Sequence, residues 1–504
     1  MAVRWAVWSG AFIAAMPAFA GPAWAHGFGQ RFDLPLPLAF WEIGAGLTIV
    51  LTFVVMALFV RERADYRYPR FDLMRISPLR ALASPPLLSA VRALVALAFL
   101  FAIYCGAVGS QDPYSNVIVT LVWIVWWVGL AFLSALVGDV WRVINPFATL
   151  FGWAERLFAR LTGRSLSLQL AYPTWLGTWP AVLLFAAFAW GELVWPSHDI
   201  PAALSRAALV YAAATFVGMF VFGRTTWRDR GEAFTLAFGV LSRFAPIGPE
   251  EYGRQATTTA ARPLYLRPLG AGLQSEERLP WSTVVFILLM LSTVTFDGFL
   301  ETPLFQAIFN RVYTTPALAR LVDAISGRGI PDAVLIKSVA LIAFPLAFVA
   351  VYAAVSWLMA KVTRPLVPVD RRPLVAAGPV ASAFVLTLVP IAVAYHLSHY
   401  FSLLMTAGQF IIPLVSDPMG AGWNLFGTAD YQVNIGLVNP KFFWYAAVTL
   451  IVLGHVIAVY LAHVAALRFF GTRRAAFVSQ VPMVALMVGY TMVSLWILAQ
   501  PIMA

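Results

Sequence analysis

Long apolar runs separated by polar loops make up most of the chain. Each run is long enough to cross the ~30 Å hydrocarbon core of a bilayer as an α-helix. The pattern therefore predicts an all-α polytopic transmembrane bundle of about ten spans, with residues 26–504 forming a single transmembrane domain in contact with the lipid bilayer. The ten runs lie near residues 38–60, 88–108, 117–138, 178–195, 202–222, 281–297, 333–359, 376–396, 441–466 and 479–499.

Composition supports the membrane assignment and excludes other classes. The chain has 504 residues, of which 61% are hydrophobic and only 11% are charged, and a soluble protein could not cover that much apolar surface. The net charge of +11 comes from arginines spread over the loops rather than gathered in one stripe, so no nucleic-acid partner is expected. Cys105 is the only cysteine, which excludes an internal disulfide and a cysteine-based metal site.

The loops between the runs differ sharply in basic residues. Because cytoplasmic loops carry the excess of Lys and Arg, the richer set is expected in the cytoplasm and both mature termini outside it. The loops at 61–87, 139–177, 223–280, 360–375 and 467–478 hold 25 Lys and Arg, whereas those at 26–37, 109–116, 196–201, 298–332 and 397–440 hold four.

Residues 1–25 have the three parts of a secretory signal peptide. Arg4 supplies the basic end, an apolar stretch follows to about residue 20, and Ala23-Trp24-Ala25 fits the small-x-small cleavage rule. Cleavage there would make His26 the first residue, and its free amine and imidazole could chelate copper or nickel together. Alternatively, His26 simply follows the cut.

Two apolar segments are too short to span. Residues 146–160 and 232–244 carry apolar and basic residues at helical spacing, which predicts short amphipathic helices on the cytoplasmic membrane face. Gly138-Asp-Val-Trp-Arg precedes the first and Gly223-Arg-Thr-Thr-Trp-Arg precedes the second. This similarity indicates either a weak internal duplication or a coincidence of composition. The apolar residues 400–415 either extend the eighth span or form a re-entrant piece.

Four histidines lie in or next to two late spans, where ionisable residues are functional candidates. His396 and His399 are three residues apart, so both rings lie on one helix face near the outer surface. His455 lies near mid-membrane on the ninth span and His463 is closer to the cytoplasm. A buried histidine can also serve only to hydrogen-bond a neighbouring helix. A haem held by His396 and His455 would require the two rings to lie at the same depth.

Two carboxylates complete the candidate site at the outer end of the sixth span. Asp297 and Glu301 are four residues apart and are the predicted catalytic pair. The predicted metal ligands are His396, His399, His26 and His455, with Asp297 as a further ligand or a general base. Imidazole and carboxylate groups suit a divalent ion such as copper or zinc, which could activate a bound water.

Several stretches together resemble the bacterial membrane-bound fenitrothion (organophosphate) hydrolases. The resemblance implies a bacterial inner membrane location, hydrolysis of an apolar phosphorothioate triester with release of a nitrophenol, and a second membrane subunit needed for activity. It supplies no residue roles. The stretches are Ala25-His-Gly-Phe-Gly-Gln-Arg-Phe-Asp-Leu-Pro-Leu-Pro37, residues 122–129 continuing to Asn145-Pro-Phe147, Ser292-Thr-Val-Thr-Phe-Asp-Gly298, Tyr395-His-Leu-Ser-His399, Ser416-Asp-Pro418, Gly454-His455 and His463.

Two other functions fit the same residues. A copper- or nickel-handling membrane protein would explain His26 and the histidines at successive depths, and a haem-binding electron-transfer subunit would explain paired intramembrane histidines. The sequence contains no P-loop, no GxSxG and no HExxH motif, which argues against an ATPase, a serine hydrolase and a zincin.

Overall fold

The computed structural model describes residues 24–27, 30–34, 36–60, 68–249, 264–275, 277–327, 329–437 and 439–500. Most of the predicted signal peptide, residues 1–23, lies outside the described residues. The predicted cleavage point after Ala25 falls within strand β1 (Trp24–Gly27), which pairs antiparallel with β2 (Gln30–Asp33).

Ten helical segments of the described ranges are long and apolar enough to cross a membrane, which confirms the multi-pass all-α fold. Several consist of consecutive helical pieces: α5 (Val117–Val119), η3 (Thr120–Gly129) and α6 (Leu130–Leu136) form one, and α17 (Ala377–Phe384), η8 (Val385–Leu388), α18 (Val389–Thr406), η9 (Ala407–Phe410) and α19 (Ile411–Ser416) form another. The others are α2 (Leu38–Phe59), α4 (Pro85–Val108), η4 (Thr174–Leu176) with α9 (Trp179–Leu193), α10 (Pro201–Phe222), α13 (Trp281–Leu300), α16 (Asp332–Thr363) with η6 (Arg364–Leu366), α20 (Pro440–Phe470) and α21 (Arg473–Ala499).

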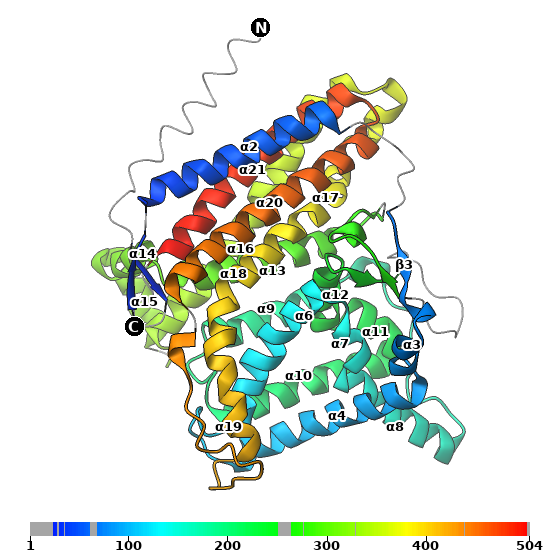
Figure 1. Cartoon of the computed structure of the whole chain (residues 1–504), viewed down its shortest axis with the longest axis vertical. Helices are drawn as coiled ribbons and strands as arrows, with labels where there is room; N and C mark the ends of the chain where they lie inside the picture. The colour runs from blue at the N-terminus through cyan, green and yellow to red at the C-terminus, as the bar shows by residue number, and fades with distance from the viewer. Residues whose placement is uncertain are drawn as a thin grey trace.

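The spans form two groups with α13 between them (Figure 1). Helices α2, α20 and α21 pack side by side, and α18 packs against α20. On the other side α4 packs against α10, and α9 packs against α13. Helix α13 is buried along almost its whole length, so polar residues that it carries lie at the centre of the bundle.

Loops predicted on the same side of the membrane meet one another. Strands β3 (Phe71–Asp72), β5 (Tyr265–Leu266) and β4 (Ile247–Gly248) pair in that order and join two of the Lys/Arg-rich loops. We call the end of the bundle that carries this sheet the basic face.

At the other end, which we call the opposite face, the backbone N–H groups of Ser110 and Val117 donate to the carbonyls of Met419 and Pro418. These contacts agree with the predicted alternation for the four loops concerned. The assignment of the basic face to the cytoplasm remains a prediction from the charge bias.

The eighth span settles one open alternative, since α18, η9 and α19 continue it without a break to Ser416. Of the two short segments predicted to be amphipathic surface helices, only the first is one. Helix α8 (Pro146–Thr162) has a polar outer side, as expected, and its last turn is exposed.

The prediction of a surface helix is wrong for α12 (Ala233–Ser242), in which eight of ten residues are buried. The reason is that α12 is apolar on all sides, and it packs inward against α6, α9 and α13.

Candidate functional site

A histidine and an aspartate from two packed spans meet near the opposite face. Nε2 of His399, on α18, lies 2.9 Å from Oδ2 of Asp297, on α13, and the hydroxyl of Tyr400 donates to the same oxygen at 2.7 Å. A carboxylate only accepts, so the ring nitrogen that faces it carries the proton. The sequence placed both residues at the outer end of their spans, and the structure brings them together.

Gly298 allows this close approach of α13, α18 and α21. A Cβ at this position would lie 2.7 Å from Cγ2 of Ile497 and 2.9 Å from Oη of Tyr395, closer than side-chain atoms pack. A glycine inside a helix costs up to about 1 kcal/mol relative to alanine. Here the missing side chain lets Tyr395 and His399 reach the turn that carries Asp297.

The His399–Asp297 pair is partly exposed, and aromatic rings surround it. The His399 side chain is 21% exposed and that of Asp297 is 26% exposed. The Tyr395 ring stacks on His399 with centroids 6.0 Å apart, and the Tyr400 ring meets it edge-on at 4.7 Å. Because Asp297 holds Nε2, the other ring nitrogen, Nδ1, is the atom of His399 that can accept a proton or bind a cation.

His396 lies one turn before His399 but faces different helices. Its ring is 5.7 Å from Trp127 on η3, 6.0 Å from Phe132 on α6 and 4.8 Å from Tyr400. The side chain is buried, and its Nε2 has no hydrogen-bond partner among the described residues. Helix η3 is a π-helix, a form found frequently at functional sites.

Glu301 follows the end of α13 and is exposed. Loss of surrounding water raises the pKa of its carboxyl, and the negative charge of Asp297 raises it further, while Lys337 opposes the shift. Glu301 therefore interacts with the His399–Asp297 pair through its charge, and no hydrogen bond joins it to the pair in the described part of the chain.

The deeper histidines belong to separate environments. Nδ1 of His455 donates to the Ile451 carbonyl at 2.8 Å within α20, and its ring lies 6.1 Å from that of Tyr490. His463 contacts the Gln480 amide, with Nδ1 and Nε2 3.1 Å apart. Neither histidine makes a hydrogen bond or a ring contact with His399 or Asp297.

The predicted metal ligands are only partly assembled. Across the described residues, no group of three or more His, Cys, Asp or Glu side chains is arranged to hold a metal ion. The backbone of His26 lies in β1, and its side chain is outside what the structure describes. The structure therefore brings Asp297 and His399 together, with His396 beside them and Glu301 at the rim.

Sequence reasoning missed Glu192, on α9. Its carboxylate lies close enough to that of Asp297 for the two negative charges to repel each other. The indole nitrogen of Trp127 faces Glu192 without closing a hydrogen bond. A carboxylate inside the apolar run 178–195 was a signal of the same kind as Asp297, so Glu192 could have been identified from the sequence.

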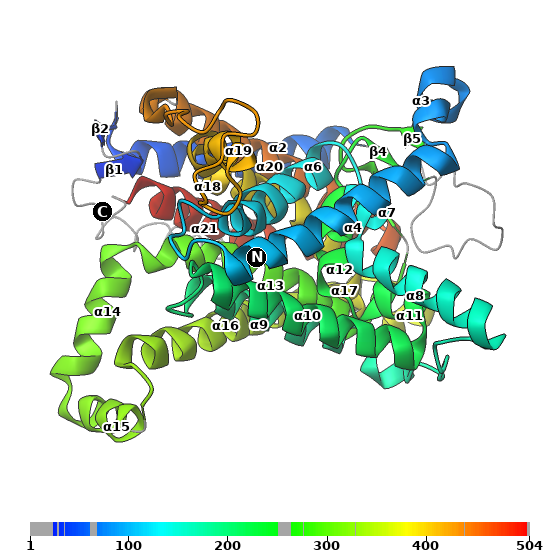
Figure 2. The same ribbon diagram turned by 90° about the horizontal axis from the view of Figure 1, so that it is seen from below.

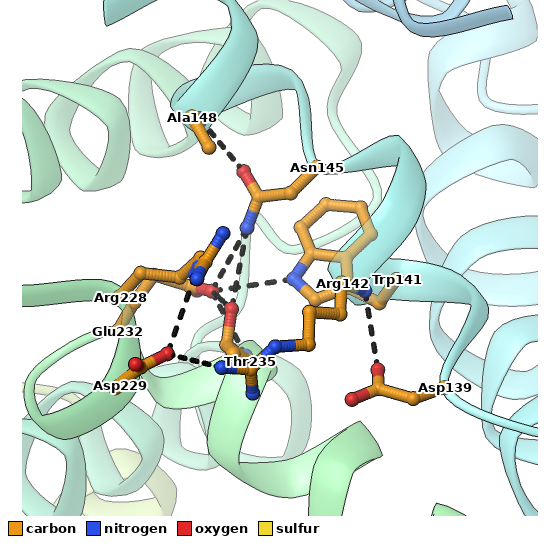
Figure 3. Close-up of polar contacts among 9 residues, drawn as sticks. All are labelled: Asp139, Trp141, Arg142, Asn145, Ala148, Arg228, Asp229, Glu232 and Thr235. Atoms are coloured by element: carbon orange, nitrogen blue, oxygen red, sulfur yellow. Dashed lines mark hydrogen bonds and ion pairs between the residues drawn. The ribbon is translucent and has the colours of Figure 1, made fainter. Parts of the chain in front are cut away.

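A second polar cluster lies on the basic face and centres on Glu232 (Figure 3). This side chain is fully buried and caps the N-terminus of α12. All six of its hydrogen bonds come from donors of the protein, so it has a structural role. The donors are the Tyr211 hydroxyl (2.5 Å), the Phe234 and Thr235 backbone N–H groups (3.0 and 2.8 Å), the Asn145 amide (3.1 Å), the Trp141 indole (3.2 Å) and the Thr235 hydroxyl.

The cluster joins the two similar segments noted in the sequence. Each segment runs from a span through a short helix to a capped helix: α7 (Val140–Ile144) precedes α8, and α11 (Arg224–Arg230) precedes α12. Asn145 caps α8 by accepting from the Ala148 N–H at 3.0 Å, so its bond to Glu232 links the two caps. Arg142 pairs with Asp229 at 2.6 Å across the same contact (Figure 3).

Comparison of the whole chain with protein-family models, with curated proteins and with solved structures found no match.

Proposed function

We propose that the protein is a membrane-embedded hydrolase of apolar organophosphorus triesters such as fenitrothion, with His399 as the general base. The single observation that carries the proposal is the 2.9 Å contact between His399 and Asp297, supported by the Tyr400 hydroxyl, at a partly exposed position within an apolar bundle. The substrate class rests on the family resemblance.

The proposed reaction uses this geometry. Nδ1 of His399 takes a proton from a water whose oxygen attacks phosphorus, the bond between phosphorus and the aryl oxygen breaks, and the nitrophenolate leaves. Asp297 holds the ring by its other nitrogen and stabilises the imidazolium that forms, as carboxylates do in histidine-based hydrolases. Tyr400 keeps the carboxylate in place. A positioned base of this kind contributes about 10²- to 10⁴-fold.

The copper or zinc ion suggested by the sequence has an incomplete set of protein ligands in the described residues. The free ring nitrogens of His399 and His396 are the ones it would use. If bound, it would supply positive charge against the developing negative charge on phosphorus. The proposal therefore assigns proton transfer to His399, and chelation tests the role of an ion separately.

The test measures nitrophenol release from fenitrothion by purified protein in liposomes. We expect His399→Gln and Asp297→Asn to lower kcat by about 10²-fold or more and Tyr400→Phe to lower it less. Matched controls are His198→Gln, which alters a histidine bonded to the Trp195 carbonyl in a loop of the same face, and Asp332→Asn, at the start of α16.

Three results would overturn parts of the proposal. No nitrophenol from the wild type would refute the substrate class. Near-normal rates in His399→Gln would refute the general base. Complete loss of wild-type activity on chelation, restored by zinc or copper, would refute a reaction that runs on the His399 base without a bound ion.

A further inference from the structure

Residues 303–326 form a helical hairpin that the sequence pattern did not reveal. Helix α14 (Pro303–Thr314) and helix α15 (Pro316–Ser326) each begin with a proline, which favours the first helical position. Thr302 caps α14, with its hydroxyl oxygen accepting from the Phe305 N–H at 3.2 Å. The hairpin therefore starts directly after the turn that contains Glu301.

The hairpin stands out sideways from the bundle at the opposite face. Figure 2 shows α14 running across the direction of α16 and α10, with α15 at its far end beside the start of α16. Helices of 12 and 11 residues are about 18 Å long or less, which is too short to cross a bilayer. Their orientation is that of helices lying along a membrane surface.

Both helices are amphipathic, with apolar residues three and four apart. The inner edge of each apolar stripe is buried, by Phe305 in α14 and Val322 in α15. The outer edge is exposed: Leu304 and Ile308 in α14, Leu318 and Leu321 in α15. The other sides carry Gln306, Asn310, Arg311 and Thr314 in α14, and Arg320, Asp323 and Ser326 in α15.

The helix that packs beside the hairpin indicates what covers this apolar stripe. Helix α16 follows the hairpin, and its Val339, Ile342 and Leu346 are among the most exposed apolar side chains of a membrane-spanning helix. Helix α16, which packs against α15, thus has exposed apolar side chains suited to contact with lipid. The exposed Arg311 and Arg320 suit phosphate headgroups, so the occupant is the bilayer.

The hairpin is also packed directly against the candidate site. The Phe305 ring lies 6.3 Å from that of Phe296 and 5.8 Å from that of Phe299, the residues one before and two after Asp297. Phe299 in turn stacks on Phe344 of α16 at 5.6 Å. A shift of α14 would therefore displace the turn of α13 that carries Asp297.

We propose that the α14–α15 hairpin lies in the interfacial layer of the bilayer on the opposite face and admits apolar ligands from that layer to the His399–Asp297 site. The location of the hairpin is independent of the proposed function, whereas its role in admitting substrate rests on it.

Location is tested with single cysteines labelled with the fluorophore NBD in phosphatidylcholine–phosphatidylglycerol liposomes. The native Cys105 is fully buried, so Cys105→Ala gives a clean background. We expect NBD at Ile308→Cys and Leu321→Cys to be quenched more strongly by lipids with a nitroxide at acyl carbon 5 than by iodide added to the water on both sides of the membrane. The expected difference is at least about twofold. The matched controls Asn310→Cys and Asp323→Cys should show the reverse.

Two outcomes would overturn the location. Equal access of iodide to both sides of each helix would place the hairpin in water. Protection of Ile308→Cys and Leu321→Cys from both quenchers would place them against protein, such as a second membrane subunit.

Admission of ligand is tested by comparing two triesters in the same liposomes. We expect Ile308→Asp with Leu321→Asp to raise KM about tenfold for fenitrothion, which partitions into lipid, and to leave that for the more water-soluble paraoxon-methyl nearly unchanged. The control Asn310→Asp should affect neither. Equal effects on both substrates would refute admission from the membrane, and a wild type without activity would refute the proposed function while leaving the NBD result intact.

Discussion

Removing the Glu232 carboxylate should be among the most damaging single changes to this protein. Glu232→Ala deprives six donors of their acceptor in a fully buried position. Hydrogen bonds to a charged group contribute about 1.5–3 kcal/mol each, and an unsatisfied buried donor costs about 1–3 kcal/mol. Loss of the N-cap adds about 0.5–2 kcal/mol.

These terms do not add fully, because water can enter the space left by the side chain. We therefore expect Glu232→Ala to lower the free energy of unfolding by about 4–5 kcal/mol, at the upper end for single substitutions.

Glu232→Gln separates the hydrogen bonds from the packing. Oε2 accepts four of the six bonds and Oε1 accepts two, from the Tyr211 hydroxyl and the Phe234 N–H. A glutamine with its oxygen at the Oε2 position keeps the four. Its amide then faces Tyr211, which can turn to accept, and the Phe234 N–H, which cannot. The expected cost is about 1–3 kcal/mol.

The assay is SDS titration of the protein in mixed micelles, followed by far-ultraviolet circular dichroism. Glu155→Gln is the control, because it breaks a surface ion pair with Arg224 at 3.5 Å and should cost less than about 1 kcal/mol. The reasoning is refuted if the free energy of unfolding of Glu232→Ala lies within about 1 kcal/mol of the wild-type value, which is less than a tenfold change in the equilibrium constant. It is also refuted if the glutamine variant is as unstable as the alanine variant.

Three further changes have defined outcomes. Gly298→Ala should lower stability by about 1–3 kcal/mol through overpacking and lower nitrophenol release by a larger factor than unfolding explains, because the new Cβ meets Tyr395 Oη at 2.9 Å; unchanged activity would contradict the packing argument. Burial raises the pKa of Asp139 from 3.8 despite the opposing charge of Arg142, so the stability that the protonated carboxyl contributes at low pH is lost as pH rises through the raised pKa. Asp139→Asn keeps an acceptor for the Arg142 N–H and should show a weaker decline in melting temperature above pH 4, and a steeper decline would contradict this sign. Asp229→Asn breaks a half-exposed ion pair and should change the unfolding free energy by less than about 1 kcal/mol, as measured in the same SDS titration.

The spans could be predicted because the length of an apolar run alone decides whether it crosses the membrane. Their alternation could be predicted because Lys and Arg mark one set of loops. The hairpin at 303–326 was missed because its apolar residues are broken by polar ones every turn, which lowers the average hydropathy. Helix α12 was misplaced because a short apolar helix has the same composition in a bilayer surface and in a protein core.

The site shows the same limit. Asp297 and His399 could be assigned to one face of the membrane from their positions in the spans. Which helices pack against each other could not be predicted from one sequence. The partnership of α13 with α18 depends on packing around Gly298 and the aromatic rings. His396 and His399, adjacent on the helix, therefore point to different neighbours.

The bond between the caps of α8 and α12 has a consequence for how the two similar segments can vary. Two glutamates at positions 145 and 232 would place two negatively charged carboxylates in contact, where they repel each other. Two asparagines would leave too few acceptor lone pairs for the donors around Glu232. The contact between Asn145 and Glu232 is therefore satisfied only by unlike residues. If the segments descend from one duplicated unit, their point of contact is the place where the copies had to diverge, and a change at either position should require a compensating change at the other.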